Sequence, residues 1–258
     1  MTDFYTENGI VYCAALSGAP SLIHGFSTRL GGVSELPHTK SLNLGYNRGD
    51  PDEVVDENFR IFKEKLGITG AVLVSAHQAH TKKVVYADGS SAHFENVDGF
   101  VTNKPGVALL VKTADCQPIL LYDEKARVIG ACHAGWRGTV AGIAAETVAA
   151  MTKLGADPKN ILAACGPCID KCCFEVGDDF VDTVAYFSDE FLQFVSKENG
   201  KYHADIKAMN RHILMCSGVP EENIRVSEEC TCCDPGKFFS HRYSKGLRGT
   251  MASVIMMK

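Results

Sequence analysis

The chain has 258 residues, with 26 Lys and Arg against 31 Asp and Glu, and a formal net charge of −5. Its length predicts one large domain covering residues 1–258. With 45% hydrophobic and 22% charged residues, the composition excludes wholesale disorder. The mild acidity argues against a nucleic-acid-binding protein, and no apolar run reaches the roughly 18 residues of a membrane helix. Residues 1–9 lack the Lys and Arg of a signal peptide, so we expect a cytoplasmic protein.

The predicted elements begin with short edge strands within residues 1–22, followed by an ordered loop over residues 24–49. A helix then starts with Asp50 as its N-cap and Pro51 at its first position, and it ends at Gly67. Further apolar segments are predicted as strands at 71–75, 84–87, 106–122, 127–132, 160–165, 224–228 and 251–257. Further helices are predicted at 139–154, 178–195 and 205–216.

Pro118 lies inside the long apolar segment 106–122, where a proline favours a strand break or an edge position. The predicted strands come partly in hairpins and partly between helices. This order favours a mixed sheet with helices outside it, which is an α+β fold rather than a doubly wound α/β fold.

Cys116 and His133 lie on the two arms of a predicted hairpin whose turn is centred between residues 124 and 125. Residues equidistant from the turn face each other, which pairs these two side chains if the pairing persists past Pro118. Opposed Cβ atoms lie about 5 Å apart, close enough for one ion to bind both residues. His80, in the segment Gln78–Ala79–His80, offers a second imidazole.

A thiolate with two imidazoles is a ligand set that suits Zn²⁺, and three protein ligands leave a fourth position open for catalysis. Zinc can lower the pKa of a bound water from ~15.7 to about 7, and the resulting hydroxide can attack C6 of adenine as in zinc deaminases. Such a reaction needs an acid/base carboxylate. Asp115 and Glu175 are candidates, although Asp115 would point to the opposite face if it lies in a strand.

Two other interpretations of the same residues stay open. Cys116 taken alone is more often a small core residue than a ligand. Cys116 could also be a nucleophile with His133 as its base, and a zinc-bound thiolate excludes that role. The odd total of 11 Cys makes a disulfide framework improbable. For the cysteines clustered at 165–173 and 230–233, the default is therefore reduced thiols without a second metal.

The sequence resembles the YfiH/YlmD family, also called laccase-domain or multicopper polyphenol oxidase proteins. The similarity runs through nearly the whole chain, and its most specific parts are Ala114-Asp-Cys-Gln-Pro118 and His133-Ala-Gly-Trp-Arg-Gly138. The other matching segments are His24-Gly-Phe-Ser-Thr-Arg29, Gly31–Ser34, Ser41-Leu-Asn-Leu-Gly45, Gln78–His80, Asp98–Gly99, Gly166–Ile169, Phe174–Gly177 and Phe239-Ser-His-Arg242. Thr81, His241 and the order Leu247–Arg248–Gly249 depart from the family's pattern, which puts one edge of the substrate pocket in doubt.

The resemblance implies a single domain with a mixed β-sandwich flanked by helices, in α/β/β/α layers. It also implies a metal site at His80, Cys116 and His133. The family is associated with phosphorolysis of adenosine, inosine and methylthioadenosine to the base and ribose 1-phosphate or its methylthio analogue. It is associated too with deamination of adenosine to inosine, and it has carried the labels copper polyphenol oxidase and peptidoglycan editing factor.

Phosphorolysis needs an anion site, and Arg29 and Arg137 are candidates because a guanidinium matches two phosphate oxygens. Each could equally be a solvated or carboxylate-paired arginine. Asn43 could hydrogen-bond a base or a ribose hydroxyl, although a turn residue is the more common role of asparagine.

The leading hypothesis is a zinc-containing purine nucleoside enzyme, a phosphorylase and adenosine deaminase, whose partners are nucleosides and phosphate. The alternative is a Cys–His hydrolase acting on a peptidoglycan precursor or an amide. A copper oxidase ranks lower, because multicopper sites need clustered histidines and the 9 His contain no His-x-His pair. A non-enzymatic, metal-stabilised binding protein would need an exposed apolar stripe or a basic patch, and the sequence shows neither.

Overall fold

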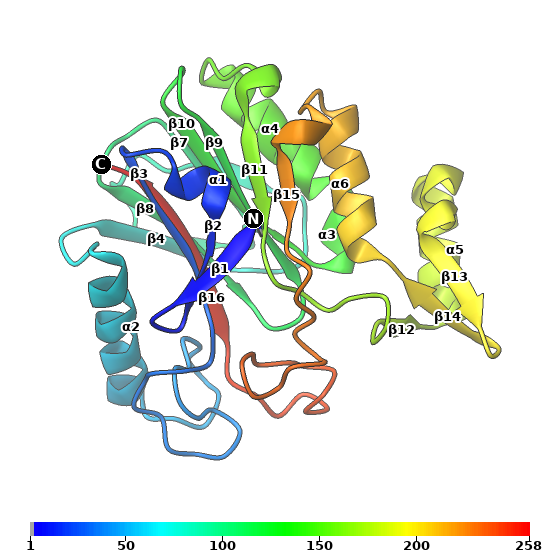
Figure 1. The fold of residues 1–258 in the computed structure, drawn as a ribbon, viewed down its shortest axis with the longest axis horizontal. Helices are drawn as coiled ribbons and strands as arrows, with labels where there is room; N and C mark the ends of the chain where they lie inside the picture. Colours follow the sequence, from blue (N-terminus) through cyan, green and yellow to red (C-terminus); the bar gives the residue numbers. More distant parts are fainter. Residues whose placement is uncertain (1–2) are drawn as a thin grey trace.

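Two mixed β-sheets packed face to face form the centre of the computed structural model, which describes residues 3–258 (Figure 1). The first sheet has seven strands, antiparallel except where β4 lies parallel to its neighbours β8 and β6. Their order is β1 (Phe4–Glu7), β2 (Ile10–Cys13), β3 (Leu22–Ser27), β16 (Met251–Met257), β8 (Val107–Thr113), β4 (Val72–His77) and β6 (His93–Glu95).

The second sheet has six strands, with an antiparallel centre and a parallel strand at each edge. Their order is β15 (Ile224–Val226), β11 (Leu162–Cys165), β9 (Gln117–Asp123), β10 (Val128–Ala134), β7 (Gly99–Thr102) and β5 (Val84–Tyr86). A small third sheet of β12 (Glu175–Val176), β14 (Lys201–Ala204) and β13 (Val195–Glu198) projects beside the main body together with α5 (Asp178–Phe187) (Figure 1).

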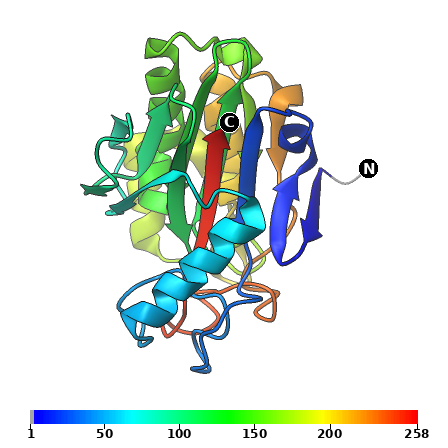
Figure 2. The ribbon, with the colours of Figure 1, turned by 90° about the vertical axis from the view of Figure 1, so that its left-hand side faces the viewer.

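Helices cover both outer faces of the sandwich. Figure 2 shows α2 (Asp52–Leu66) lying across the seven-stranded sheet, where its buried residues pack on β8 and β16. On the opposite side, α4 (Ile143–Lys153) and α6 (Ile206–Cys216) pack on the six-stranded sheet. The predicted α+β fold is thereby confirmed, with α/β/β/α layers. The remaining helices are α1 (Ala14–Ser17), α3 (Trp136–Val140) and the 3₁₀ turns Pro158–Asn160, Asp189–Phe194 and Glu221–Asn223.

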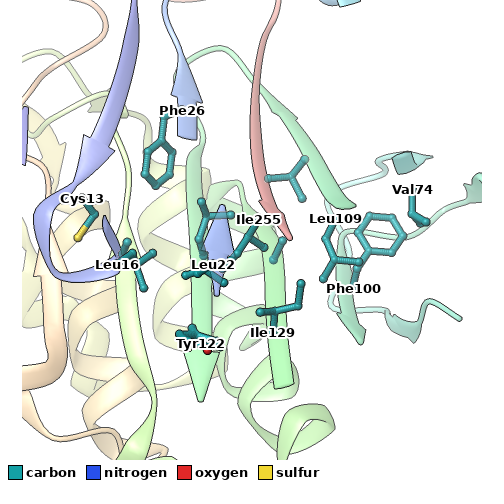
Figure 3. Packing of buried hydrophobic residues seen from close by; sticks show 14 of the residues in the cluster. Cys13, Leu16, Leu22, Phe26, Val74, Phe100, Leu109, Tyr122, Ile129 and Ile255 are labelled. Carbon is teal, nitrogen blue, oxygen red and sulfur yellow. The ribbon is translucent and has the colours of Figure 1, made fainter. Parts of the chain in front are cut away.

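The main core lies between the two sheets, where Phe26, Leu109 and Ile255 meet Tyr122 and Ile129 (Figure 3). Strand β9 shows why the run from Ile119 to Tyr122 is apolar without interruption. Leu120 and Tyr122 belong to this core, whereas Ile119 and Leu121 belong to the core beneath α4 and α6. Successive side chains of a strand point to opposite faces, so a strand buried on both faces needs no polar residues. Among the helices of residues 3–258, none combines the length and hydropathy that a membrane crossing requires.

The long apolar segment 106–122 contains the expected break, since β8 ends at Thr113 and β9 begins at Gln117. The edge position expected for Pro118 is wrong, because β9 lies between β10 and β11 in the sheet. Proline is accommodated there because Pro118 is the second residue of β9, before the pairing with β11 starts at Ile119.

Other differences from the predicted elements concern strands and helix ends. The strands β6, β7, β13 and β14 were not predicted, and β3 extends to Ser27 inside the predicted loop 24–49. The helix predicted over 139–154 is two helices, divided where Gly142 adopts a positive φ of 89°. Asp50 is not the N-cap of α2; its carboxylate accepts hydrogen bonds from the side chains of Ser34, Thr39 and Asn43 instead. The helix predicted over 178–195 stops at Phe187 and continues as a 3₁₀ turn.

Candidate functional site

His80, Cys116 and His133 come together at one end of the sandwich, as the sequence pattern predicts. One donor atom from each lies within 4.8 Å of the other two. His133 is in β10, Cys116 is in the link between β8 and β9, and His80 follows β4 with a positive φ of 57°. His133 is buried, Cys116 is partly buried and His80 is exposed, and all three line the same cavity.

The hairpin register behind the prediction is wrong by two residues. In the structure His133 pairs with Pro118, and Ala134 with Gln117. Continuing this register would place Cys116 opposite Gly135 instead of His133. A shift of two residues keeps each side chain on its own face of the sheet, so the two side chains still meet.

Asp98 fixes the geometry of this group from beneath. It is fully buried, and its Oδ1 lies 2.8 Å from Nδ1 of His133. The backbone N–H groups of Ala79, His80 and Thr81 also donate to its carboxylate. Burial raises the pKa of Asp98, but the hydrogen bonds from His133 and Thr81 outweigh it and lower the pKa to about 2. An ionised Asp98 holds the proton of His133 on Nδ1 and leaves Nε2 free for a metal.

Gly135 provides the space between the donors. A Cβ atom at this position would clash with the ring of His80 and lie 3.2 Å from Sγ of Cys116. Burial and the neighbouring charge of His133 lower the pKa of His80, which favours the neutral imidazole that a metal requires. The thiol, the two imidazoles and the space between them therefore fit a metal ion with three protein ligands.

The three donors line a cavity of about 980 Å³ that is rich in cationic side chains. Arg48, Lys112 and Arg248 line it, and none of them forms an ion pair with a carboxylate of residues 3–258. Nε of Arg248 is buried without a hydrogen-bond partner in the described part of the chain. Burial and the charge of Arg48 lower the pKa of Arg248 to about 10 and also lower the pKa of Lys112. Mutually repelling cations around one opening form a site for an anion.

The carboxylates of the two predicted acid/base residues are engaged in contacts with other parts of the chain. Asp115 lines the cavity, but its Oδ1 accepts a hydrogen bond from the Thr231 hydroxyl and its Oδ2 one from the backbone N–H of Arg242. Its carboxylate thus joins three loops. Glu175 does not line the cavity; its side chain is exposed and pairs with Lys201 at 2.9 Å. The geometry supports a structural role for Asp115 and a surface role for Glu175.

The residues predicted to bind substrate do not line the cavity either. Arg29 donates to the backbone carbonyls of Lys40, Pro37 and Pro235. Arg137 has its guanidinium 4.2 Å from the ring centroid of Trp136.

Asn43 is fully buried, and its side chain supports a loop. Its amide donates to the Asp50 carboxylate and to the carbonyl of Gly45, and it accepts from the backbone N–H of Thr250. Arg248, which sequence reasoning missed as a site residue, directly precedes the Gly249–Thr250 segment that this loop holds. Only the unusual Leu247–Arg248–Gly249 order drew attention to it; for Arg48 and Lys112 the sequence offers no comparable signal.

Comparison with known proteins gives the family. Residues 23–258 match the family model described as multi-copper polyphenol oxidoreductase laccase. The chain belongs to this family. It is 38% identical to the purine nucleoside phosphorylase YlmD of Bacillus subtilis, over 92% of this chain and 89% of that protein. It is 37% identical to the adenosine deaminase RL5 of an unknown prokaryotic organism, over 85% and 88% of the two chains. The crystal structure of the Bacillus licheniformis hypothetical protein YfiH superimposes with a TM-score of 0.92 at 31% identity and covers all of both chains.

Proposed function

We propose that this member of the laccase family is a zinc-containing purine nucleoside enzyme. It cleaves adenosine, inosine and methylthioadenosine with phosphate, and it deaminates adenosine to inosine. The names of the relatives support the substrate class. The observation that carries the proposal is the group of Arg48, Lys112 and Arg248, which form no ion pair with a carboxylate of residues 3–258 and lie beside the donors His80 and Cys116 in one cavity.

The three cations hold phosphate in this proposal. Arginine binds two phosphate oxygens at once, and lysine adds a point charge. Phosphorolysis forms a bond from a phosphate oxygen to C1′ of the ribose and breaks the bond from C1′ to N9 of the base. Fixed cations orient the phosphate for that attack, while Trp136 and Phe174 give the cavity an apolar wall against which a purine ring can lie.

Zinc suits the donor set better than copper does. Mixed nitrogen and sulfur ligands with one open position are typical of catalytic zinc, which supplies Lewis-acid chemistry at such a site. A mononuclear copper site with two His and one Cys usually adds a distant Met or Gln ligand. None of the methionines among residues 3–258 lines the cavity, and both amide atoms of Gln78 are engaged with the backbone of Lys112.

The alternative function, a Cys–His hydrolase acting on a peptidoglycan precursor or an amide, also has geometric support. Cys116, His133 and Asp98 have the order of nucleophile, base and orienting carboxylate that hydrolytic triads use. This interpretation gives no role to His80 or to the three cations. An activity that survives complete removal of metal would favour it.

Phosphate kinetics test the proposal. Metal-quantified protein is incubated with inosine at varied phosphate, beside Arg248→Met, Lys112→Met and the exposed control Arg60→Met. Each lost charged hydrogen bond contributes about 1.5–3 kcal/mol, so we expect the KM for phosphate to rise about 10- to 150-fold in the two cavity variants and to stay unchanged in the control. Circular dichroism verifies that the variants fold. Absence of phosphate-dependent base release from the zinc-loaded wild type would refute the phosphorylase, and absence of inosine from adenosine would refute the deaminase.

A further inference from the structure

A second cluster of thiols lies outside the cavity, where two turns far apart in the sequence meet. Cys172 and Cys173 come from the turn before β12, and Cys230 and Cys233 come from the loop after β15. All four sulfur atoms lie within 4.8 Å of one another. The pair Cys165 and Cys168, whose spacing resembles a metal-binding motif, takes no part in this cluster, and both residues are fully buried.

The distances between the sulfur atoms match one shared centre. The Sγ atom of Cys172 lies 3.7 Å from that of Cys173, 3.9 Å from that of Cys230 and 3.5 Å from that of Cys233. Zn–S bonds of about 2.3 Å in a tetrahedron place sulfur atoms about 3.8 Å apart. The sulfur of Cys233 is almost equally far from Cys172 and Cys173, at 3.5 and 3.4 Å, so no one pair is singled out for a disulfide.

The backbone beside the cluster offers a hydrogen-bond donor to the sulfur of Cys230. The N–H of Asp170 lies 3.3 Å from the sulfur. The segment Cys230-Thr-Cys-Cys233 has Cys-x-x-Cys spacing, which zinc sites commonly use for two of their four ligands.

We propose that Cys172, Cys173, Cys230 and Cys233 bind a structural Zn²⁺ ion through four thiolates. The four thiols lose their protons to solvent as the ion binds. Because all four protein ligands are sulfur, the ion has no open position and serves structure instead of catalysis. A tetrahedral set of four sulfur atoms selects zinc or iron, and zinc needs no redox partner.

The ion would join two segments that form part of the cavity wall. Phe174, which lines the cavity, directly follows Cys173, and Arg242, which also lines it, donates to the carbonyl of Cys173. In the other turn, Thr231 donates to Asp115 next to the donor Cys116. The thiolate site therefore holds the wall in place from outside, and its existence does not depend on the reaction in the cavity.

Metal content tests the proposal directly. Protein purified with zinc under reducing conditions is expected to hold about two equivalents in the wild type and about one in Cys172→Ser/Cys233→Ser. The control Cys216→Ser removes an exposed cysteine outside the cluster and is expected to keep both. In Cys116→Ala, the X-ray absorption of the remaining zinc is expected to show sulfur neighbours only, at about 2.3 Å.

Alkylation of the wild type keeps the test independent of whether the serine variant folds. Cys172, Cys233 and Cys216 are all exposed, so each can react with iodoacetamide, and the rate of each is compared before and after a chelator is added. A bound ion is expected to slow Cys172 and Cys233 at least tenfold until the chelator is added, whereas the rate of Cys216 stays unchanged. Rates of Cys172 and Cys233 that the chelator does not change, unchanged zinc in the double variant, or a disulfide within the cluster of the reduced protein would overturn the proposal. One equivalent of iron in place of zinc would overturn the choice of ion.

Discussion

Replacing Asp98 by Asn should separate the role of this carboxylate from that of the metal donors it supports. Its Oδ1 accepts from Nδ1 of His133 at 2.8 Å and from the backbone N–H of His80 at 3.1 Å. Its Oδ2 accepts from the backbone N–H groups of Ala79 at 3.2 Å and Thr81 at 2.7 Å. An asparagine offers one acceptor oxygen and one NH₂ group, so it can satisfy only one of these two sets.

Either orientation of the amide damages the site. With NH₂ in place of Oδ2, two backbone N–H groups lose their acceptors. With NH₂ in place of Oδ1, the amide of His80 loses its acceptor, and His133 must carry its proton on the nitrogen that a metal needs. A buried N–H without an acceptor costs about 1–3 kcal/mol, and at least one N–H loses its acceptor in either orientation, so we expect the free energy of unfolding to fall by at least about 1–3 kcal/mol. Loss of such a supporting carboxylate typically lowers metal affinity about 10- to 100-fold.

The matched control is Asp123→Asn. Asp123 is also fully buried and accepts backbone N–H groups from Ala126 and Asp157, but it lies at the hairpin turn away from the donors. Zinc affinity is measured by competition with a chromophoric chelator, and stability by denaturant unfolding. Both variants should lose stability, but only Asp98→Asn should release zinc more readily. Equal zinc affinity in the two variants would refute the reasoning.

Two further changes test other features. Gly135→Ala places a methyl group against the ring of His80 and should remove most of the zinc from the cavity site. The control Gly70→Ala, with nothing within 4 Å of its added Cβ, should retain the zinc, and metal analysis of both variants distinguishes these outcomes. Burial lowers the pKa of His24 from 6.5 to about 4, and Nε2 of His24 accepts from the N–H of Cys13. The unfolded state therefore takes up the proton first as the pH falls, and the free energy of unfolding should drop by about 2 kcal/mol between pH 8 and pH 5 from this residue alone. Denaturant unfolding at both pH values should show a smaller drop in His24→Gln, and an identical drop would contradict the assignment.

The sequence indicates the fold class because the apolar side chains of a single strand can pack alternately into two different cores. In β9 the residues Ile119 to Tyr122 contribute alternately to two cores, which explains the unbroken apolar run from which a strand was predicted there. Helix ends were harder to predict, since Asp50 and Gly142 act through tertiary contacts and backbone conformation instead of local preference.

The candidate metal donors could be found from the sequence because Cys116 directly precedes β9 and His133 lies in the neighbouring strand β10, close enough along the chain for a hairpin to relate them. A register error of two residues did not matter, since it preserves the face. The anion site could not be found in this way. Arg48 and Arg248 are 200 positions apart, and only the tertiary fold places both beside Lys112. Local chemistry favoured Arg29 instead, whose guanidinium donates hydrogen bonds to three backbone carbonyls.

Two buried carboxylates explain how the cavity keeps its shape before anything binds. His80 and Asp115 both adopt positive φ, at 57° and 85°, a conformation that costs a residue other than glycine about 1–3 kcal/mol. Asp98 offsets this cost at His80 by accepting the backbone N–H of His80 and of both its neighbours. Asp115 offsets the cost of its own positive φ by accepting hydrogen bonds from the Thr231 hydroxyl and from the backbone N–H of Arg242. Asp115 directly precedes Cys116, so these hydrogen bonds fix the turn that orients the thiol. This structural role explains why Asp115 lies beside a candidate metal donor without any part in proton transfer.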